Sequence, residues 1–230
     1  MNIAIILASG MGKRMGADKN KVFLELGGKP LIFYTLDNFE QSPDVDEIVI
    51  VAKEDEINDM QEIVDEFGFE KVSHIIAGGK ERQNSGHNGV KCVRDNYDNE
   101  DIIVLFHNGA NPFVSEHEIK CVADAAHKNG AAVVAHPTKD TIRKVDNDNI
   151  SKGVIDRSEL WNMQTPQAIQ LELALKAFDE AEEKDFIGTD DVSLVEELGG
   201  DVIIVEASDN NFKVTTPIDL ALAEVILSQK

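Results

Sequence analysis

The sequence has few cysteines, no long apolar run and fewer basic than acidic residues, and each shortage excludes a class of protein. Cys92 and Cys121 are the two cysteines among 230 residues, and neither has a Cys-x-x-Cys or Cys/His metal spacing. We therefore expect free thiols in a reducing compartment. The apolar run at residues 3–8 is too short to span a membrane and lacks a signal peptide's basic flank and cleavage site. We expect a cytoplasmic protein with no membrane partner.

The charge balance narrows the choice of partner. The chain has 43 acidic and 22 basic residues, which give a net charge of −21. Nucleic acids and anionic membranes bind basic faces, so neither is expected as a partner. An anionic small molecule is compatible with this composition, because a few Lys and Arg side chains suffice to line one cleft.

Segments with strand-like and helix-like apolar patterns alternate along the chain. This alternation predicts an α/β fold with a mostly parallel sheet and helices on both faces, in a single domain spanning residues 1–230. The expected strands are residues 3–7, 47–52, 72–76, 101–106, 131–135 and 202–206. The expected helices are residues 31–39, 56–67, 85–93, 115–129, 168–182, 190–197 and 217–227.

Residues 138–160 interrupt this alternation. Two short strand-like pieces, 141–145 and 153–156, flank the polar run 146–149, which predicts a hairpin. A two-stranded ribbon with so little apolar surface is marginal alone. We therefore expect this inserted arm to lie on its own domain or to reach a partner subunit.

The segment 7–16 directly follows the first expected strand. Gly10 and Gly12 let backbone amides approach a phosphate closely, and Lys13 and Arg14 place positive charge in a very acidic chain. The segment has no Gly-Lys-Ser/Thr, which excludes a Walker loop, and its GxGxxxG spacing departs from the dinucleotide fingerprint. Phosphate binding is the functional interpretation, and a glycine-rich turn with solvated lysines is the structural one.

Further polar segments follow strands or precede helices, where ligand sites occur in open α/β sheets. Each is also compatible with a plain loop or helix cap; Thr189, for example, reads as an N-cap. These segments are 78–89, 107–113, 140–143 with 156–167, 189–191 and 211–217.

Taken together, the segments resemble the IspD family, the 2-C-methyl-D-erythritol 4-phosphate cytidylyltransferases, and relatives that act on ribitol 5-phosphate. The resemblance rests on LASGMGKRM (7–15), GGKERQNS (78–85), LWNMQTPQ (160–167) and NFKVTTPIDL (211–220), in order along the whole chain. It implies a Rossmann-like, GT-A-like nucleotidyltransferase fold whose β-hairpin arm, residues 138–160, is swapped across a homodimer.

The resemblance also implies a reaction and roles for individual residues. CTP and an alditol phosphate, foremost 2-C-methyl-D-erythritol 4-phosphate, would give a CDP-alditol and pyrophosphate with Mg²⁺ that needs few dedicated protein ligands. The implied catalytic residues are Arg14, Lys21 and Lys213. The implied nucleotide-binding residues are Ala8, Ser9, Gly10, Met11, Gly12, Lys13, Gly78, Gly79, Arg82, Ser85 and Asn108. The implied acceptor-binding residues are Asn111, Thr141, Arg157, Thr165 and Thr189.

Two departures from the family pattern keep other functions open. The family usually has His-Asp-Ala-Ala-Arg-Pro where this chain has residues 107–112, with Asn108 and Asn111 in place of the charged pair. The segment 86–89 reads GHNG where the family pattern after Ser85 begins with Val. A ribitol 5-phosphate or other polyol-phosphate cytidylyltransferase, or an inactive nucleotide-binding homodimer, would also fit. The retained cations Arg14, Lys21 and Lys213 favour an enzyme.

Overall fold

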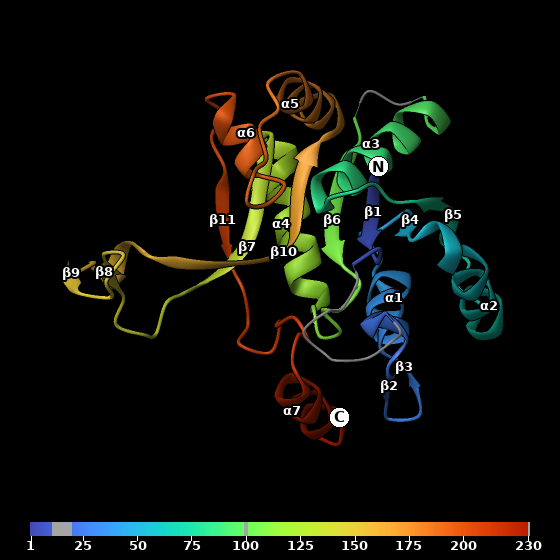
Figure 1. The fold of residues 1–230 in the computed structure, drawn as a ribbon. Coiled ribbons are helices and arrows are strands. Elements are labelled where there is room, and N and C mark those ends of the chain that lie inside the picture. The colour runs from blue at the N-terminus through green and yellow to red at the C-terminus, as the bar shows by residue number, and fades with distance from the viewer. Residues whose placement is uncertain (11–19, 99–100, 230) are drawn as a thin grey trace.

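A seven-stranded sheet forms the centre of the computed structural model, which describes residues 1–10, 20–98 and 101–229 (Figure 1). Its third strand, β10, is antiparallel to both neighbours, and the other neighbouring pairs are parallel. The predicted mostly parallel α/β fold is therefore confirmed. In order across the sheet, the strands are β11 (Ile203–Glu206), β7 (Ala131–Pro137), β10 (Trp161–Gln170), β6 (Ile103–Asn108), β1 (Asn2–Leu7), β4 (Glu47–Ala52) and β5 (Val72–Ala77).

Alternate residues of the central strands enter two separate cores. In β1, Ala4 and Ile6 pack into one core, whereas Ile3 and Ile5 pack into the other, and all four are fully buried. Because both faces of the sheet are covered, the central strands are nearly continuous apolar runs.

Helices cover both faces of the sheet, as the sequence predicts. The first core includes residues of α1 (Leu31–Gln41), α2 (Ile57–Phe67) and α4 (Glu116–Asn129). The second includes residues of α3 (Arg82–Asn96), α5 (Leu171–Glu183) and α6 (Ser193–Glu197). The last helix, α7 (Pro217–Leu227), contacts the small β2–β3 ribbon (Glu25–Leu26 and Lys29–Pro30). Within the described ranges, no helix combines the length and apolar character needed to cross a membrane.

The strand β10 is the main element that the sequence analysis missed. We expected a helix from residue 168, but Ala168 and Ile169 are fully buried in β10 and α5 begins at Leu171. Ala168 pairs with Leu105 of β6 on one side and with Ala132 of β7 on the other. Two adjacent apolar residues such as Ala168 and Ile169 fit the apolar pattern of a helix and that of a buried strand equally well. Periodicity alone therefore does not distinguish the two structures.

Two helix starts also differ from the predicted ones. The helix α3 begins at Arg82, three residues before the expected Ser85, because the Glu81 side chain caps it. The helix expected from residue 190 begins at Ser193, with Val192 at its N-cap position and no side-chain cap. Asp190 Oδ1 accepts a hydrogen bond from Ser193 N at 3.0 Å in the turn before this helix, and Thr189 is not its cap.

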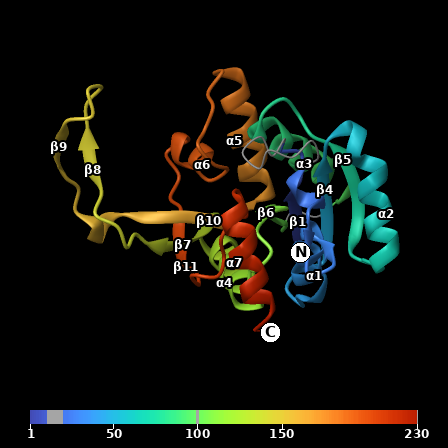
Figure 2. The same ribbon diagram turned by 60° about the horizontal axis from the view of Figure 1, so that its bottom comes forward.

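The predicted hairpin lies between β7 and β10. Its antiparallel strands β8 (Arg143–Val145) and β9 (Ser151–Val154) project away from the sheet (Figures 1 and 2). Val145 and Val154 are each 59% exposed, and Ile150 is 57% exposed. The arm therefore does not fold back onto its own sheet, and its apolar side chains are left uncovered in a single chain.

A fully buried histidine lies near the carboxyl end of β6. His107 Nε2 donates to the backbone oxygen of Asn111 at 3.0 Å, and the His107 ring lies 4.9 Å from the ring of Phe39. Burial lowers the pKa of His107 from 6.5 to about 4, and the charge of Lys213 acts in the same direction. The imidazole is therefore neutral at pH 7.

We expect His107 to make the protein less stable in mild acid. The unfolded chain binds a proton at the ordinary pKa of 6.5, whereas the folded chain resists protonation until about 4. This contribution, about 3 kcal/mol, is present in full above pH 6.5 and is lost as the pH falls to 4. Urea unfolding of the wild type and of His107→Gln, which keeps a donor for Asn111, measures it. Equal losses of unfolding free energy in the two proteins would contradict the assignment.

Candidate functional site

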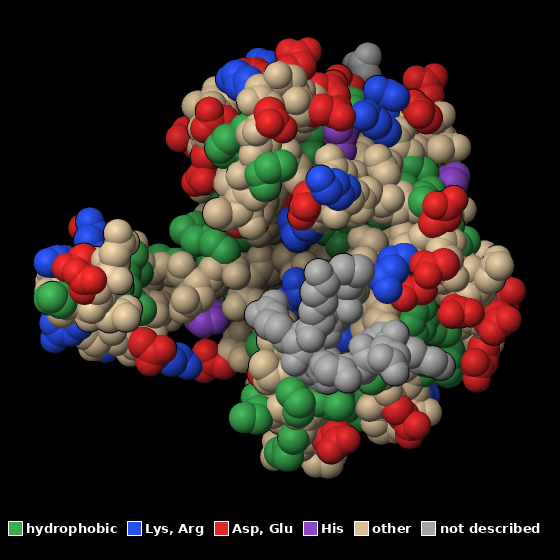
Figure 3. All heavy atoms as spheres, viewed as in Figure 1, with side chains coloured by type: hydrophobic (Ala, Val, Ile, Leu, Met, Phe, Trp, Pro, Cys, Tyr) green, Lys and Arg blue, Asp and Glu red, His purple; other side chains and the backbone are tan. Residues whose placement is uncertain are grey.

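The carboxyl ends of β1, β5 and β6 meet at one edge of the sheet, where a pocket of about 310 Å³ lies. Several Lys and Arg side chains lie near the middle of the view in Figure 3 and others lie on the arm and at the rim, whereas most acidic side chains lie nearer the periphery. This is the edge at which open parallel sheets bind ligands. The described residues that line the pocket are Leu7, Ser9, Gly10, Gly79, Lys80, Glu81, Arg82, Ser85, Asn108 and Lys213.

Two of the predicted nucleotide-binding loops contact each other in this pocket. Ser9 Oγ, after β1, lies 3.0 Å from Ser85 Oγ, at the start of α3. Ser85 Oγ accepts a hydrogen bond from Gly79 N at 3.0 Å and donates to Glu81 O at 3.1 Å. A Cβ on Gly78 would lie 2.8 Å from both serine hydroxyls, so this close approach requires glycine. The structure thus brings together the predicted residues of segments 8–10 and 78–85.

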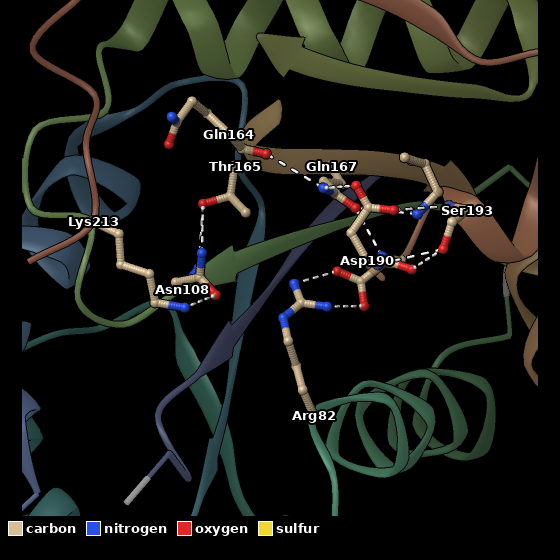
Figure 4. Close-up of polar contacts among 10 residues, drawn as sticks. Arg82, Asn108, Gln164, Thr165, Gln167, Asp190, Ser193 and Lys213 are labelled. Carbon is tan, nitrogen blue, oxygen red and sulfur yellow. Dashed lines mark hydrogen bonds and ion pairs between the residues drawn. The ribbon is translucent and has the colours of Figure 1, made fainter. Parts of the chain in front are cut away.

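The residue Asn108 connects three elements at the end of β6 (Figure 4). Its Oδ1 accepts a hydrogen bond from Lys213 Nζ at 3.1 Å, and its Nδ2 donates to Thr165 Oγ1 of β10 at 3.4 Å. The Lys213 side chain is half-buried, and it lines the pocket beside the Asn108 amide. A lysine held in this way offers a fixed positive charge to an anionic ligand.

The second predicted cation, Lys21, is tied to the residue next to Lys213. Lys21 Nζ donates to Val214 O at 2.8 Å, and Val214 N donates to Ala110 O at 2.9 Å. The preceding residue, Asn20, donates to Ala8 O at 2.6 Å, which holds the Lys21 turn against the end of β1. The chain therefore places Lys21 and Lys213 around one short segment.

The remaining residues of the predicted phosphate loop lie outside the described part of the chain. They are Met11, Gly12, Lys13 and Arg14.

The guanidinium of Arg82 pairs with a buried carboxylate at the side of the pocket. Arg82 Nη1 and Nη2 donate to the two oxygens of Asp191 at 2.7 and 2.6 Å. Burial lowers the pKa of Arg82, but the Asp191 carboxylate outweighs it and the net pKa is raised. Burial raises the pKa of Asp191, and Arg82 opposes this increase. Arg82 lines the pocket, with its charge already matched by a protein partner.

The side chain of Gln167 fixes the loop that carries Asp191. Gln167 Oε1 accepts from Asp191 N at 2.9 Å and from Val192 N at 3.1 Å. Gln167 Nε2 donates to Asp190 Oδ2 at 3.0 Å (Figure 4). Gln167 and Asp191 lie in two of the polar segments that the sequence marks as candidates, but no local pattern indicates a role for either residue. The same holds for Lys80 and Glu81, which lie in the glycine-rich segment 78–89.

The predicted acceptor-binding residues are not all brought together within one chain. Thr165 contacts Asn108, and Thr189 lines a neighbouring pocket that shares Arg82 with the main one. Asn111 is 1% exposed and its Nδ2 donates to Asn211 Oδ1 at 3.5 Å, so it lies behind the pocket surface. The other two predicted residues lie on the exposed arm: Thr141 and Arg157.

The described lining is poor in ligands for a divalent ion. Its one carboxylate, Glu81, accepts a hydrogen bond from Asn84 N as the cap of α3. Asn108 Oδ1 is engaged by Lys213. A Mg²⁺ ion at this pocket would therefore depend on oxygens of the bound ligand and on water, as Mg²⁺ often does in phosphate sites.

Sequence and structure comparisons agree on one family. A family model described as IspD, 2-C-methyl-D-erythritol 4-phosphate cytidylyltransferase, matches residues 2–229. The chain is 46% identical to the enzyme of that name from Halalkalibacterium halodurans over 226 residues, 98% of this chain and 96% of the relative.

A second relative and a crystal structure are similar over almost their whole lengths. The Clostridium acetobutylicum enzyme of the same name is 45% identical over 230 residues, 100% of this chain and 98% of that protein. The crystal structure of 4-diphosphocytidyl-2C-methyl-D-erythritol synthase from Anaerococcus prevotii has a TM-score of 0.85 at 29% identity and covers 99% of this chain and 96% of its own. The chain therefore belongs to the IspD family, a family of cytidylyltransferases.

Proposed function

We propose that the protein transfers the cytidylyl group of CTP to 2-C-methyl-D-erythritol 4-phosphate and releases pyrophosphate, a step of isoprenoid precursor synthesis. The observation that carries this proposal is the full-length family match combined with a pocket lined by Lys213, Asn108 and the contacting pair Ser9 and Ser85. The relatives at 45% and 46% identity have this activity in their names.

The proposed reaction needs charge stabilisation more than a base. The phosphate of the acceptor is already an anion at neutral pH, and one of its oxygens attacks the α-phosphorus of CTP. A new P–O bond forms while the bond to the bridging oxygen of pyrophosphate breaks. Lys21 and Lys213, with Arg14, would stabilise the charge that builds on the α-phosphoryl oxygens, and Gly10 and Gly12 amides would hold the outer phosphates.

The serine contact supports a site for the cytosine base. Ser85, Gly79 and Asn108 line the same pocket, and Gly78 immediately precedes Gly79. Hydroxyl and backbone groups in fixed positions can recognise the polar edge of a base, and the Asn108 amide can bond to ribose hydroxyls. Ala8, Ser9 and Arg82 complete this proposed nucleotide site.

A Mg²⁺ ion fits the same proposal. When bound, the ion would neutralise part of the triphosphate charge. The described pocket lining contains one carboxylate, Glu81, so phosphate oxygens and water would supply most of the ligands. Lys213 and Lys21 remain the protein groups that hold the transferred phosphoryl group.

The altered 107–112 segment favours a second candidate, transfer to ribitol 5-phosphate or another polyol phosphate. Pyrophosphate release with CTP and Mg²⁺ on a panel of alditol phosphates separates the candidates. We expect the highest kcat/KM with 2-C-methyl-D-erythritol 4-phosphate. A higher value with ribitol 5-phosphate would replace the proposed acceptor. Binding of CTP without pyrophosphate release from any acceptor would instead indicate an inactive nucleotide-binding protein.

We expect Lys21→Ala and Lys213→Ala each to lower kcat far more than the affinity for CTP. Their ammonium groups would meet charge that develops during transfer, and losing one such contact costs about 2–4 kcal/mol, or roughly a hundred- to a thousandfold in rate. Steady-state kinetics measures the effect, with Lys184→Ala as the control, because Lys184 pairs with Glu180 on the surface. Unchanged kcat with a raised KM would show that the lysines only bind CTP.

We also propose a homodimer held in part by the arm of residues 138–160. The exposed Val145, Ile150 and Val154 support this, because the arm leaves them uncovered in the single chain. Thr141 and Arg157 would then meet the acceptor phosphate in the partner's pocket. That the chain is one domain with an inserted arm also remains a prediction.

Deletion of residues 140–158 is expected to give a monomer without transferase activity. Light scattering at micromolar concentration measures the mass, and the pyrophosphate assay measures the activity. Val145→Asp with Val154→Asp is a milder test, because it keeps the hairpin length and places two charges on the apolar surface. A monomeric wild type, or a doubly substituted protein that stays dimeric, would contradict the arm-mediated dimer.

A further inference from the structure

A histidine and two carboxylates meet between α3 and α5, and none of them lines the nucleotide pocket. His87 Nε2 lies 2.9 Å from Asp179 Oδ1, and His87 Nδ1 lies 3.3 Å from Glu182 Oε2. The His87 side chain is 5% exposed, whereas those of Asp179 and Glu182 are 54% and 61% exposed. Within the described ranges this is the one place where three His, Cys, Asp or Glu side chains come together in this way.

We propose that His87, Asp179 and Glu182 form a binding site for a divalent transition-metal ion of the zinc type. One candidate ligand atom from each residue lies within 4.8 Å of the other two. Zinc binds imidazole nitrogen at about 2.0–2.1 Å and carboxylate oxygen at about 2.0–2.2 Å. Asp179 contacts Nε2 and Glu182 contacts Nδ1, so an ion bound to one ring nitrogen requires the carboxylate at the other nitrogen to turn toward it. Both carboxylates are more than half exposed, which leaves room for this turn.

The imidazole is held in place before any ion binds. The His87 ring stacks on Phe178 with ring centroids 5.5 Å apart and an interplanar angle of 24°. Gly86 permits this packing, because a Cβ there would lie 3.1 Å from Phe178 Cζ. The GHNG segment, which departs from the family pattern, thus positions a buried nitrogen ligand. Preorganised ligands lose less entropy when they bind an ion.

Space for the remaining ligands lies beside the cluster. A pocket of about 200 Å³ is lined by His87, Glu182, Asp185 and Asn84, among others, and it can hold water. Zinc sites with three protein ligands commonly keep water in the fourth position.

The donor set also selects between metals. An imidazole nitrogen suits Zn²⁺, Co²⁺ or Ni²⁺, whereas Mg²⁺ prefers an all-oxygen shell. The net charge of −21 favours the approach of a cation. One cation of the protein competes: Lys91 Nζ lies 3.6 Å from Glu182 Oε2.

Ion binding would link two helices that now meet through side-chain contacts. His87 lies on α3, while Asp179 and Glu182 lie one turn apart on α5. An ion that binds only the folded chain raises its stability by mass action. The site therefore predicts that Zn²⁺ raises the melting temperature.

Calorimetric titration of the full-length, nucleotide-free protein with Zn²⁺ in excess Mg²⁺ tests the proposal. We expect one Zn²⁺ per chain, and a loss of at least about tenfold in affinity in Asp179→Asn and in Glu182→Gln, because each removes a charged ligand. Both residues are exposed, so the variants should fold normally. Lys91→Met should bind Zn²⁺ more tightly, because it removes the competing ammonium group.

The control is His117→Asn, because His117 and Cys121 form a second possible zinc-binding pair with a separation of 3.6 Å between Nε2 and Sγ. We expect this variant to bind Zn²⁺ like the wild type and to show the same rise in melting temperature. Absence of Zn²⁺ binding in excess Mg²⁺ would overturn the proposal. Equal binding by the wild type, Asp179→Asn and Glu182→Gln, or loss of binding in His117→Asn, would also overturn it.

Discussion

The segment 211–214 holds the pocket together, because its hydrogen bonds join parts of the chain that are far apart in sequence. Asn211 Nδ2 donates to Thr165 O at 2.8 Å, which attaches the segment to β10. Lys213 and Val214 attach it to the end of β6, and Lys21 donates to it from beyond β1. A shift of this segment would move Lys21, Lys213 and Asn108 together. The proposed electrostatic stabilisation would therefore depend on one short loop.

Most of the fold could be predicted from the sequence because its strands and helices have distinct apolar periods. The helix from Glu116 is a clear example, since Ser115 and Glu118 form the capping box that their spacing indicates. The strand β10 could not be predicted in the same way. Its first half, residues 161–165, mixes apolar and polar residues and is partly exposed, so no buried apolar run marks it as a strand, and its partners are found only in β6 and β7. Tertiary pairing overrides local pattern in such a segment.

The site could be predicted to the level of segments but not of side-chain partners. Parallel strands bring their following loops to one edge, so Ser9, Gly79 and Asn108 lie together as expected. The partner of Arg82, by contrast, is Asp191, 109 positions away, and nothing local to either residue reveals the pairing. Asn111 lies in the interior for a similar reason, because the Asn211 segment covers it.

The placement of charge has a consequence for the encounter between enzyme and nucleotide. The protein carries a net charge of −21, and its cations near the pocket act over a short distance. At physiological ionic strength, charges on either molecule are screened beyond about 8 Å. In dilute buffer the screening is weaker, so the net negative charge of the protein repels a free triphosphate before it comes close to Lys213. Moderate salt should speed this diffusional capture, and a triphosphate that arrives already bound to Mg²⁺ meets less repulsion.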